Sequence, residues 1–272
     1  MPRKRYDWKL KSRTLLLGER TLIAGLLDLS SSEDPDRAFV HAIAFADQGA
    51  DIVELAADPP VDGAAPVSEA EELRRLVPAL KRLKGRIEIP VAVLTSRHAV
   101  AQKAIEYGAE ILHDPTGLTL DLEIAKVATQ ADAGFILSHA RGAPGSWAKQ
   151  PGFKNPVETV VQELSAAVSR ATRAGVLRHR LVIDPGFGYG KRKEHNIELL
   201  ARLDQLAILN VPIAVAPFDK AFLPPQYDPQ APAISIAALT TAVLSGAHIL
   251  TVPDVAAARA ATYLTDEVLR AD

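Results

Sequence analysis

The chain has 272 residues, 48% of them hydrophobic, which is enough to bury about three quarters of the unfolded surface in one core. It contains no cysteine, which excludes disulfide bonds, thiolate metal sites and a cysteine nucleophile, and favours a reducing, cytoplasmic location. With 31 basic and 33 acidic residues the net charge is -2, so we expect neither nucleic acid nor an anionic membrane as the main partner.

The first segment, residues 1–13, is basic but has no apolar stretch like that of a signal peptide, so no targeting segment is expected. No run of 18 consecutive apolar residues occurs, and we expect no transmembrane helix. No stretch resembles an interdomain linker. Residues 1–272 are therefore predicted to form a single domain, with an N-terminal hairpin in 1–20 and the repeated units in 21–270.

Short apolar runs rich in strand-forming residues recur along the chain, and each is followed by a segment with helical periodicity. The predicted strands are residues 21–27, 51–55, 91–94, 110–112, 134–138, 181–183, 212–215 and 248–252. The predicted helices are residues 35–48, 68–83, 98–107, 120–130, 156–174, 196–206, 232–244 and 254–269. Residues 8–20, which precede the first strand, are predicted to form a short hairpin.

These strand and helix units match the size and rhythm of a TIM (β/α)8 barrel of the α/β class, with the hairpin closing its bottom. Continuous apolar strands are expected where both faces of a sheet are covered. A doubly wound open sheet is the alternative. Three long connections, residues 56–67, 139–155 and 216–231, follow predicted strands, and loops of such length are typical of functional sites.

The stretch 181–191 reads LVIDPGFGYGK, in which three strand-forming residues directly precede a carboxylate, a proline and three glycines. Pro185 cannot donate to a sheet ladder, and glycine adopts backbone angles that other residues avoid, so the strand must end near Asp184. Ligand groups of parallel α/β folds lie at the carboxyl ends of strands. Asp184 is therefore a candidate binding residue; the alternative is a loop that needs its glycines for a turn alone.

Six segments carry a further pattern through their order and spacing. They are residues 17–23, 49–54, 66–78, 139–144, 184–191 and 239–255. Together they resemble the dihydropteroate synthases, the pterin-binding barrel enzymes of folate synthesis, and the match at 184–191 is the most specific. The resemblance covers nearly the whole chain.

The resemblance implies a transferase that joins p-aminobenzoate to the methylene carbon of a hydroxymethyl-dihydropterin diphosphate and expels magnesium-bound diphosphate. It implies Mg²⁺ as the cofactor and a homodimer as the assembly. The alanine-rich predicted helices 232–244 and 254–269 also favour the homodimer. Such chemistry needs a carboxylate for the amino-pyrimidine edge, cations for the departing diphosphate, and exclusion of water from the electrophilic methylene.

Position by position, the resemblance implies that Lys220 and Asp28 are catalytic. Asp28 is also the implied magnesium ligand, because hard cations prefer oxygen. An ionised Asp184 would accept two N–H donors from the pterin ring. The residues implied to bind the pterin are Asp184, His113, Asp114, Lys220, Gly186, Tyr189 and Ser138. Of these, His113 stands where the family has an asparagine.

Other positions depart from the family pattern. The neighbours of Asp28 do not match, residues 58–63 lack the family's hydroxyls and arginine, Leu94 replaces a carboxylate, and Phe218 replaces a serine. The Arg-x-His pair that holds the diphosphate reads Thr251-Val252-Pro253. Each charge-assisted hydrogen bond to such a group contributes about 1.5–3 kcal/mol, so this change bears directly on turnover.

The sequence thus leaves open whether the chain catalyses the condensation. The alternatives are a non-catalytic paralogue that binds a pterin-like ligand or serves as a partner subunit, and an enzyme with another substrate, as in methyl-pterin-related barrels. Arg97, Lys191 and Arg192 are the nearby cations that would replace the missing pair. The basic cluster around Arg178, Arg180 and residues 191–193 is otherwise predicted to be solvated surface.

Overall fold

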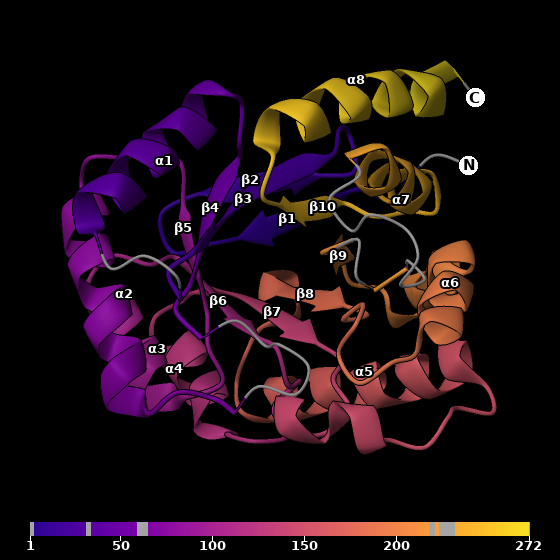
Figure 1. Cartoon of the computed structure of the whole chain (residues 1–272), viewed down its shortest axis with the longest axis horizontal. Coiled ribbons are helices and arrows are strands. Elements are labelled where there is room, and N and C mark those ends of the chain that lie inside the picture. Colours follow the sequence, from indigo (N-terminus) through magenta and orange to yellow (C-terminus); the bar gives the residue numbers. More distant parts are fainter. Residues whose placement is uncertain (1–2, 31–33, 59–64, 218–220, 223–231, 272) are drawn as a thin grey trace.

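The computed structural model describes residues 3–30, 34–58, 65–217, 221–222 and 232–271, and within them eight parallel strands form one sheet (Figure 1). In chain order the strands are β3 (Leu22–Asp28), β4 (Ile52–Ala56), β5 (Val91–Leu94), β6 (Ile111–Asp114), β7 (Gly134–Ser138), β8 (Leu181–Asp184), β9 (Ala214–Val215) and β10 (Ile249–Val252). Their order in the sheet is β8-β7-β6-β5-β4-β3-β10-β9. Sequential neighbours of this kind are typical of a barrel.

The two outer strands of this order, β8 and β9, meet each other. Ile183 of β8 forms a parallel bridge with Ile213, and the Ile183 amide donates to the Pro212 carbonyl at 3.0 Å. The predicted barrel is therefore confirmed, and the open sheet is excluded. The strand predicted over 212–215 is shorter than expected because Pro212 has no N–H to donate to a ladder.

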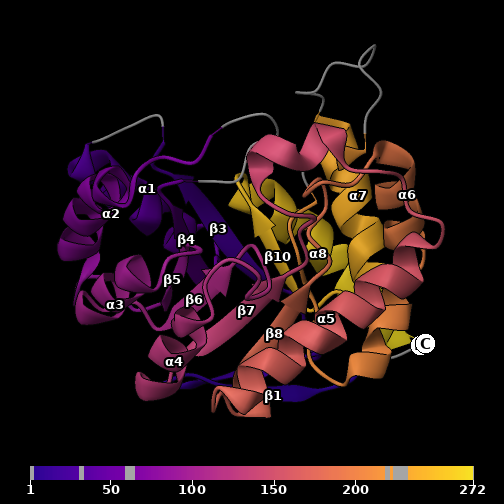
Figure 2. The same ribbon diagram turned by 90° about the horizontal axis from the view of Figure 1, so that it is seen from below.

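A helix follows each strand and covers the outside of the barrel (Figure 2). The helices are α1 (Pro35–Asp47), α2 (Glu69–Leu83), α3 (His98–Glu106), α4 (Glu123–Gln130), α5 (Pro156–Arg173), α6 (Lys193–Ala201), α7 (Pro232–Leu244) and α8 (Val255–Ala271). Short 3₁₀ turns η1 (Pro144–Lys149), η2 (Arg178–Arg180) and η3 (Leu203–Leu209) lie between them. Among the described residues, no helix has the length and apolar character that crossing a membrane requires.

The capping chemistry explains where two of these helices begin. Ser68 accepts the Glu71 amide at 3.2 Å and starts α2 as predicted. Helix α6 starts at Lys193 rather than at the predicted Asn196. His195 accepts the amide of Arg192, the N-cap residue, through Nδ1, and so supplies a partner for a backbone N–H that the helix itself leaves unpaired.

The predicted hairpin closes the amino-terminal end of the barrel. Strand β1 (Tyr6–Lys9) pairs antiparallel with β2 (Thr14–Leu17), and β1 lies across one end of the barrel in Figure 2. Trp8 is 1% exposed, packs with apolar side chains from the barrel strands, and donates its indole N–H to the Arg180 carbonyl at 2.8 Å. The hairpin is therefore a plug for the barrel interior.

Replacement of Trp8 by alanine tests this plug. We expect Trp8→Ala to lower the free energy of unfolding by about 3–5 kcal/mol, because it leaves a cavity under the strands. Leu16→Ala on the exposed side of the same hairpin is the matched control and should change it by less than about 0.5 kcal/mol. Urea denaturation measures both; equal effects of the two substitutions would show that the hairpin does not seal the core.

Candidate functional site

Asp184 is the last residue of β8 and lies buried at the carboxyl end of the barrel, as predicted, with 2% of its surface exposed. Its Oδ1 accepts the Gly186 amide at 2.8 Å, and its Oδ2 accepts the Ser138 hydroxyl at 2.7 Å. Ser138 is the residue directly opposite Asp184 in the β7–β8 register. Burial raises the pKa of the Asp184 carboxyl, while His113 and these hydrogen bonds oppose that rise.

The loop after Asp184 turns through three glycines with positive φ. Gly186 has φ +64°, and a Cβ there would lie 2.1 Å from the His139 carbonyl oxygen. Gly188 has φ +82°, but a Cβ there would meet its nearest neighbour at 3.7 Å. Glycine is thus required for conformation at both positions, and at Gly186 also for space.

The buried side chain of Lys191 holds this loop through hydrogen bonds. Its Nζ donates to the carbonyls of Gly186 at 2.7 Å, His139 at 2.9 Å and Tyr189 at 3.3 Å. The prediction of a solvated Lys191 was therefore wrong, because a run of basic residues in the sequence does not reveal which one turns inward. Burial lowers its pKa to about 7, yet three carbonyl acceptors match the three protons of the ammonium form.

Tyr189 is 8% exposed and stacks on Trp147 of η1, with ring centroids 5.1 Å apart and planes 23° apart. Burial raises the pKa of its phenol well above the ordinary value. Trp147 in turn donates to the Gly142 carbonyl at 3.1 Å. One face of the Tyr189 ring is thus covered by protein, and its contact with a flat ligand stays a prediction.

His113 lies inside the barrel between two carboxylates. Its Nδ1 is 2.5 Å from Glu54 Oε1, its Nε2 is 2.7 Å from Ser138 Oγ, and Thr251 donates to Glu54 Oε2 at 2.9 Å. Sequence reasoning missed Glu54 and Thr251. An acid within the apolar run of β4 was the available signal for Glu54.

Asp114 and Asp28 do not join this cluster. Asp114 accepts the Thr116 amide and hydroxyl and the Leu118 amide, so its carboxylate holds the loop after β6. Asp28 is exposed at the end of β3 and accepts the Ser30 amide at 2.8 Å. In the described part of the chain, no three His, Asp or Glu side chains gather as a metal site.

Several predicted positions lie outside the described residues. These are Lys220, Phe218 and residues 59–63 of the loop after β4. Leu94, which replaces a family carboxylate, is buried at the end of β5 with 6% exposure.

Two of the three cations considered as substitutes for the missing diphosphate clamp already bind other protein groups. Arg97 pairs with Glu72 and with Asp58, the latter at 3.3 Å, and also donates to the Val67 carbonyl. Lys191 binds loop carbonyls, and Arg192 is exposed at the start of α6. Arg97 and Lys191 are therefore occupied by other protein groups, whereas Arg192 is exposed.

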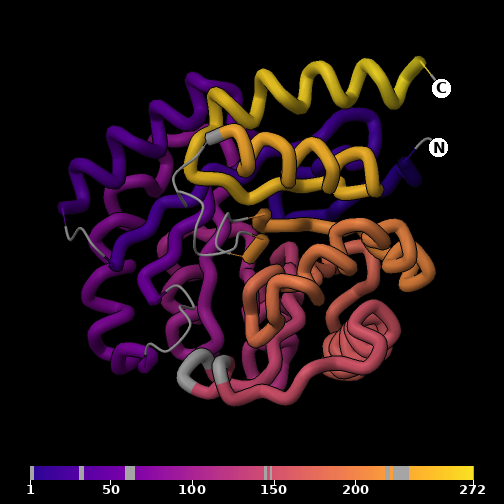
Figure 3. Tube along the Cα trace, turned by 45° about the vertical axis from the view of Figure 1, so that its right-hand side comes forward, coloured from indigo at the N-terminus to yellow at the C-terminus, as the bar shows by residue number. Residues whose placement is uncertain are grey.

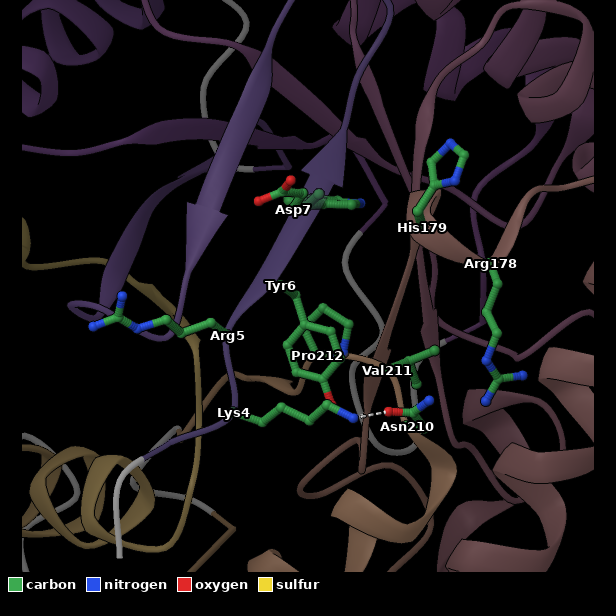
Figure 4. A pocket seen from close by; sticks show the side chains of 10 residues that line it. Lys4, Arg5, Tyr6, Asp7, Arg178, His179, Asn210, Val211 and Pro212 are labelled. Atoms are coloured by element: carbon green, nitrogen blue, oxygen red, sulfur yellow. Dashed lines mark hydrogen bonds between the residues drawn. The ribbon is translucent and has the colours of Figure 1, made fainter.

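A separate cavity of about 640 Å³ lies at the opposite end of the barrel, beside the hairpin (Figure 4). It is lined by Lys4, Arg5, Tyr6, Asp7, Trp8, Arg178, His179, Asn210, Val211 and Pro212. Its basic groups have partners, since Lys4 donates to Asn210, Arg5 pairs with Glu19, and Arg178 donates to the Leu209 carbonyl. We therefore place the candidate site at Asp184.

A pair of glycine substitutions separates the two demands on the loop. Gly188→Ala should cost about 1–2 kcal/mol in unfolding free energy, the price of a left-handed alanine. Gly186→Ala should cost a further ~1–3 kcal/mol, because its methyl group overlaps the His139 carbonyl. Urea denaturation compares the two variants. Equal losses of unfolding free energy would mean that the close contact at Gly186 is relieved at no cost in stability.

The sequence of the chain is similar to those of known proteins. The family model described as "Pterin binding enzyme" matches residues 26–253. The chain is 32% identical to the dihydropteroate synthase of Synechocystis sp. over 97% of this chain and 93% of that protein.

Solved structures of dihydropteroate synthases have the same fold as this chain. A Yersinia pestis dihydropteroate synthase with a sulfonamide drug superposes with a TM-score of 0.91 at 26% identity, covering 98% of this chain and 100% of that one. The Thermus thermophilus dihydropteroate synthase in complex with 4-aminobenzoate superposes with a TM-score of 0.85 at 33% identity, covering 97% and 100%. With a buried carboxylate and a glycine-rich loop at the expected end of the barrel, the chain belongs to the dihydropteroate synthase family of pterin-binding enzymes.

Proposed function

We propose that this chain binds a pterin with its amino-pyrimidine edge on Asp184 and condenses a hydroxymethyl-dihydropterin diphosphate with p-aminobenzoate. The observation that carries the proposal is the buried Asp184 carboxylate at the carboxyl end of β8, in a chain that is similar to dihydropteroate synthases over nearly its full length. The solved relative from T. thermophilus binds 4-aminobenzoate, the second reactant. The cysteine-free sequence favours the cytoplasm as the place of this reaction.

The geometry of Asp184 suits this ligand. Each carboxylate oxygen already accepts one protein donor, Gly186 or Ser138, and keeps one lone pair for a ligand N–H. Two adjacent N–H groups of an amino-pyrimidine would complete the four hydrogen bonds that a carboxylate accepts. A closed barrel also excludes water, which strengthens these bonds and protects an electrophilic methylene carbon.

Magnesium would be held by Asp28 in this proposal. Mg²⁺ commonly takes one or two carboxylates together with substrate phosphates and waters, so an exposed carboxylate at the mouth of the barrel fits it. The bound ion would neutralise charge on the departing diphosphate. Lys220, predicted to be catalytic, would act on the p-aminobenzoate side of the pterin.

A second candidate function is pterin binding without the condensation. It is favoured by Thr251, which occupies the position of a clamp arginine and donates to Glu54 instead of facing a diphosphate. Arg97, one of the cations considered as a substitute for the clamp, is engaged with Glu72. A chain with this electrostatic arrangement would recognise the ring and leave the diphosphate without the clamp arginine.

Replacement of Asp184 by asparagine tests the shared part of both proposals. We expect Asp184→Asn to weaken binding of 6-hydroxymethylpterin about 100-fold or more, because two charge-assisted hydrogen bonds of about 1.5–3 kcal/mol each are lost. Asp254→Asn is the matched control, since Asp254 caps α8 on the same side of the barrel and asparagine also caps helices. Calorimetry that gives equal affinities for the two variants would refute the pterin site.

Turnover separates the two candidate functions. The chain is incubated with hydroxymethyl-dihydropterin diphosphate, p-aminobenzoate and Mg²⁺, and dihydropteroate is measured by mass spectrometry. The synthase proposal predicts product that disappears in Asp184→Asn and on magnesium chelation. Tight pterin binding with no product at any magnesium concentration would establish the second candidate instead.

We also propose a homodimer formed through α7 and α8, which lie side by side (Figures 1 and 3). Helix α8 exposes three large apolar side chains, Tyr263, Leu264 and Val268, at 71%, 65% and 49%. Grouped apolar residues of this kind are typical of an interface.

Leu264→Glu tests the dimer. Light scattering should give twice the 29.2 kDa of one chain for the unchanged protein and one chain for the variant, because a buried carboxylate has no partner there. Ile208→Glu, at an apolar residue on η3 that is 77% exposed, should remain dimeric. A monomeric unchanged protein would exclude this assembly.

A further inference from the structure

Five polar side chains from five strands form a single hydrogen-bonded chain inside the barrel. In order they are Thr251 of β10, Glu54 of β4, His113 of β6, Ser138 of β7 and Asp184 of β8. Every member is at most 5% exposed. Buried polar groups at this depth need complete hydrogen bonding, so the positions of the protons can be worked out.

The protons are assigned from the Asp184 end. Ser138 has one hydroxyl proton and donates it to Asp184 Oδ2, so Ser138 Oγ must accept from His113 Nε2. At the other end, Thr251 donates to Glu54 Oε2, and the remaining Glu54 Oε1 faces His113 Nδ1. An ionised Glu54 then requires a proton on Nδ1 as well. With both carboxylates ionised, both ring nitrogens carry hydrogen and His113 is an imidazolium.

Charge balance favours the same assignment. Two carboxylates, Glu54 and Asp184, lie in this interior, and the imidazolium stands between them, with Nε2 3.8 Å from Asp184 Oδ2. Burial alone lowers the pKa of His113, but Glu54 and Asp184, and to a smaller extent Asp114 on its own strand, raise it above the ordinary value. For Asp184, His113 is the strongest influence against the rise caused by burial, followed by its hydrogen bonds and Lys191.

We propose that His113 is a positioning residue, held as an imidazolium by Glu54, which through Ser138 keeps Asp184 ionised and oriented for a ligand edge with two adjacent N–H donors. This inference rests on the proposed pterin site at Asp184. An asparagine, the residue that the family pattern has at this position, carries no charge and supplies no such compensation. In this chain the recognition carboxylate therefore depends on a cation one hydroxyl away.

The proposal predicts what happens when the cation is removed. His113→Asn leaves Glu54 and Asp184 as two buried carboxylates without a cation between them, and such pairs take up a proton at higher pH. Once Asp184 shares that proton it loses acceptor capacity for the ligand. Adding Glu54→Gln removes the second carboxylate and so restores an ionised Asp184.

The first experiment is the pH dependence of binding. Calorimetric titration with 6-hydroxymethylpterin from pH 7.5 to 5.5 should change the affinity of the unchanged protein by less than about threefold. The His113→Asn variant should lose roughly tenfold per pH unit below its new Asp184 pKa, and the His113→Asn/Glu54→Gln double variant should regain the flat profile. A flat profile in His113→Asn, or a steep one in the double variant, would overturn the proposal.

His248→Gln is the matched control. His248 is a second buried histidine of the same barrel, but it accepts the Ile213 amide and faces the Lys4 carbonyl at the opposite end. Its replacement should leave the binding profile flat. A steep profile in this variant would show that loss of any buried histidine has the effect, and would refute a specific role for His113.

The second experiment needs no ligand. In ¹⁵N-histidine NMR spectra of the unchanged protein, the signals absent from His113→Asn identify His113, and they should show two protonated nitrogens from pH 6 to 8. One protonated and one bare nitrogen at pH 6 would overturn the inference. Failure of the unchanged protein to bind pterin at any pH would refute the proposed function instead, while the spectra still decide the state of His113.

Discussion

The buried carboxylate of Asp184 sets the main physical constraint on this barrel. Moving a carboxylate out of water costs several kcal/mol unless donors or a positive charge compensate it. Gly186, Ser138 and, through the serine, His113 supply that compensation. The arrangement stabilises the carboxylate in the interior and leaves one lone pair on each of its oxygens without a protein donor.

The rest of the fold serves to keep this group in place. The hairpin covers the far end of the barrel with Trp8, so the layer of polar side chains lies next to a layer of buried apolar side chains. On the other side, Lys191 ties the glycine-rich loop to the His139 carbonyl, and Gly186 allows the two segments to approach. The site is thus positioned by strands and by a loop that Lys191 holds through three backbone carbonyls, and such rigid support maintains a precise geometry.

Much of the fold could be predicted from the sequence, because strand and helix periods alternate regularly and glycines and prolines mark the ends. The same local signals identified Asp184 as the end of a strand. They did not reveal that Lys191 turns inward, because a run of basic residues has no period that distinguishes a buried member. Nor did they reveal Glu54 as the partner of His113, since the two are 59 positions apart and meet only when the barrel closes.

The position of a bound pterin is the most direct test of this account. A crystal structure of the chain with 6-hydroxymethylpterin should show two ring N–H groups within hydrogen-bond distance of Asp184, with Ser138 and His113 unmoved beneath it. A pterin bound elsewhere, or one whose pyrimidine edge faces away from Asp184, would contradict the account.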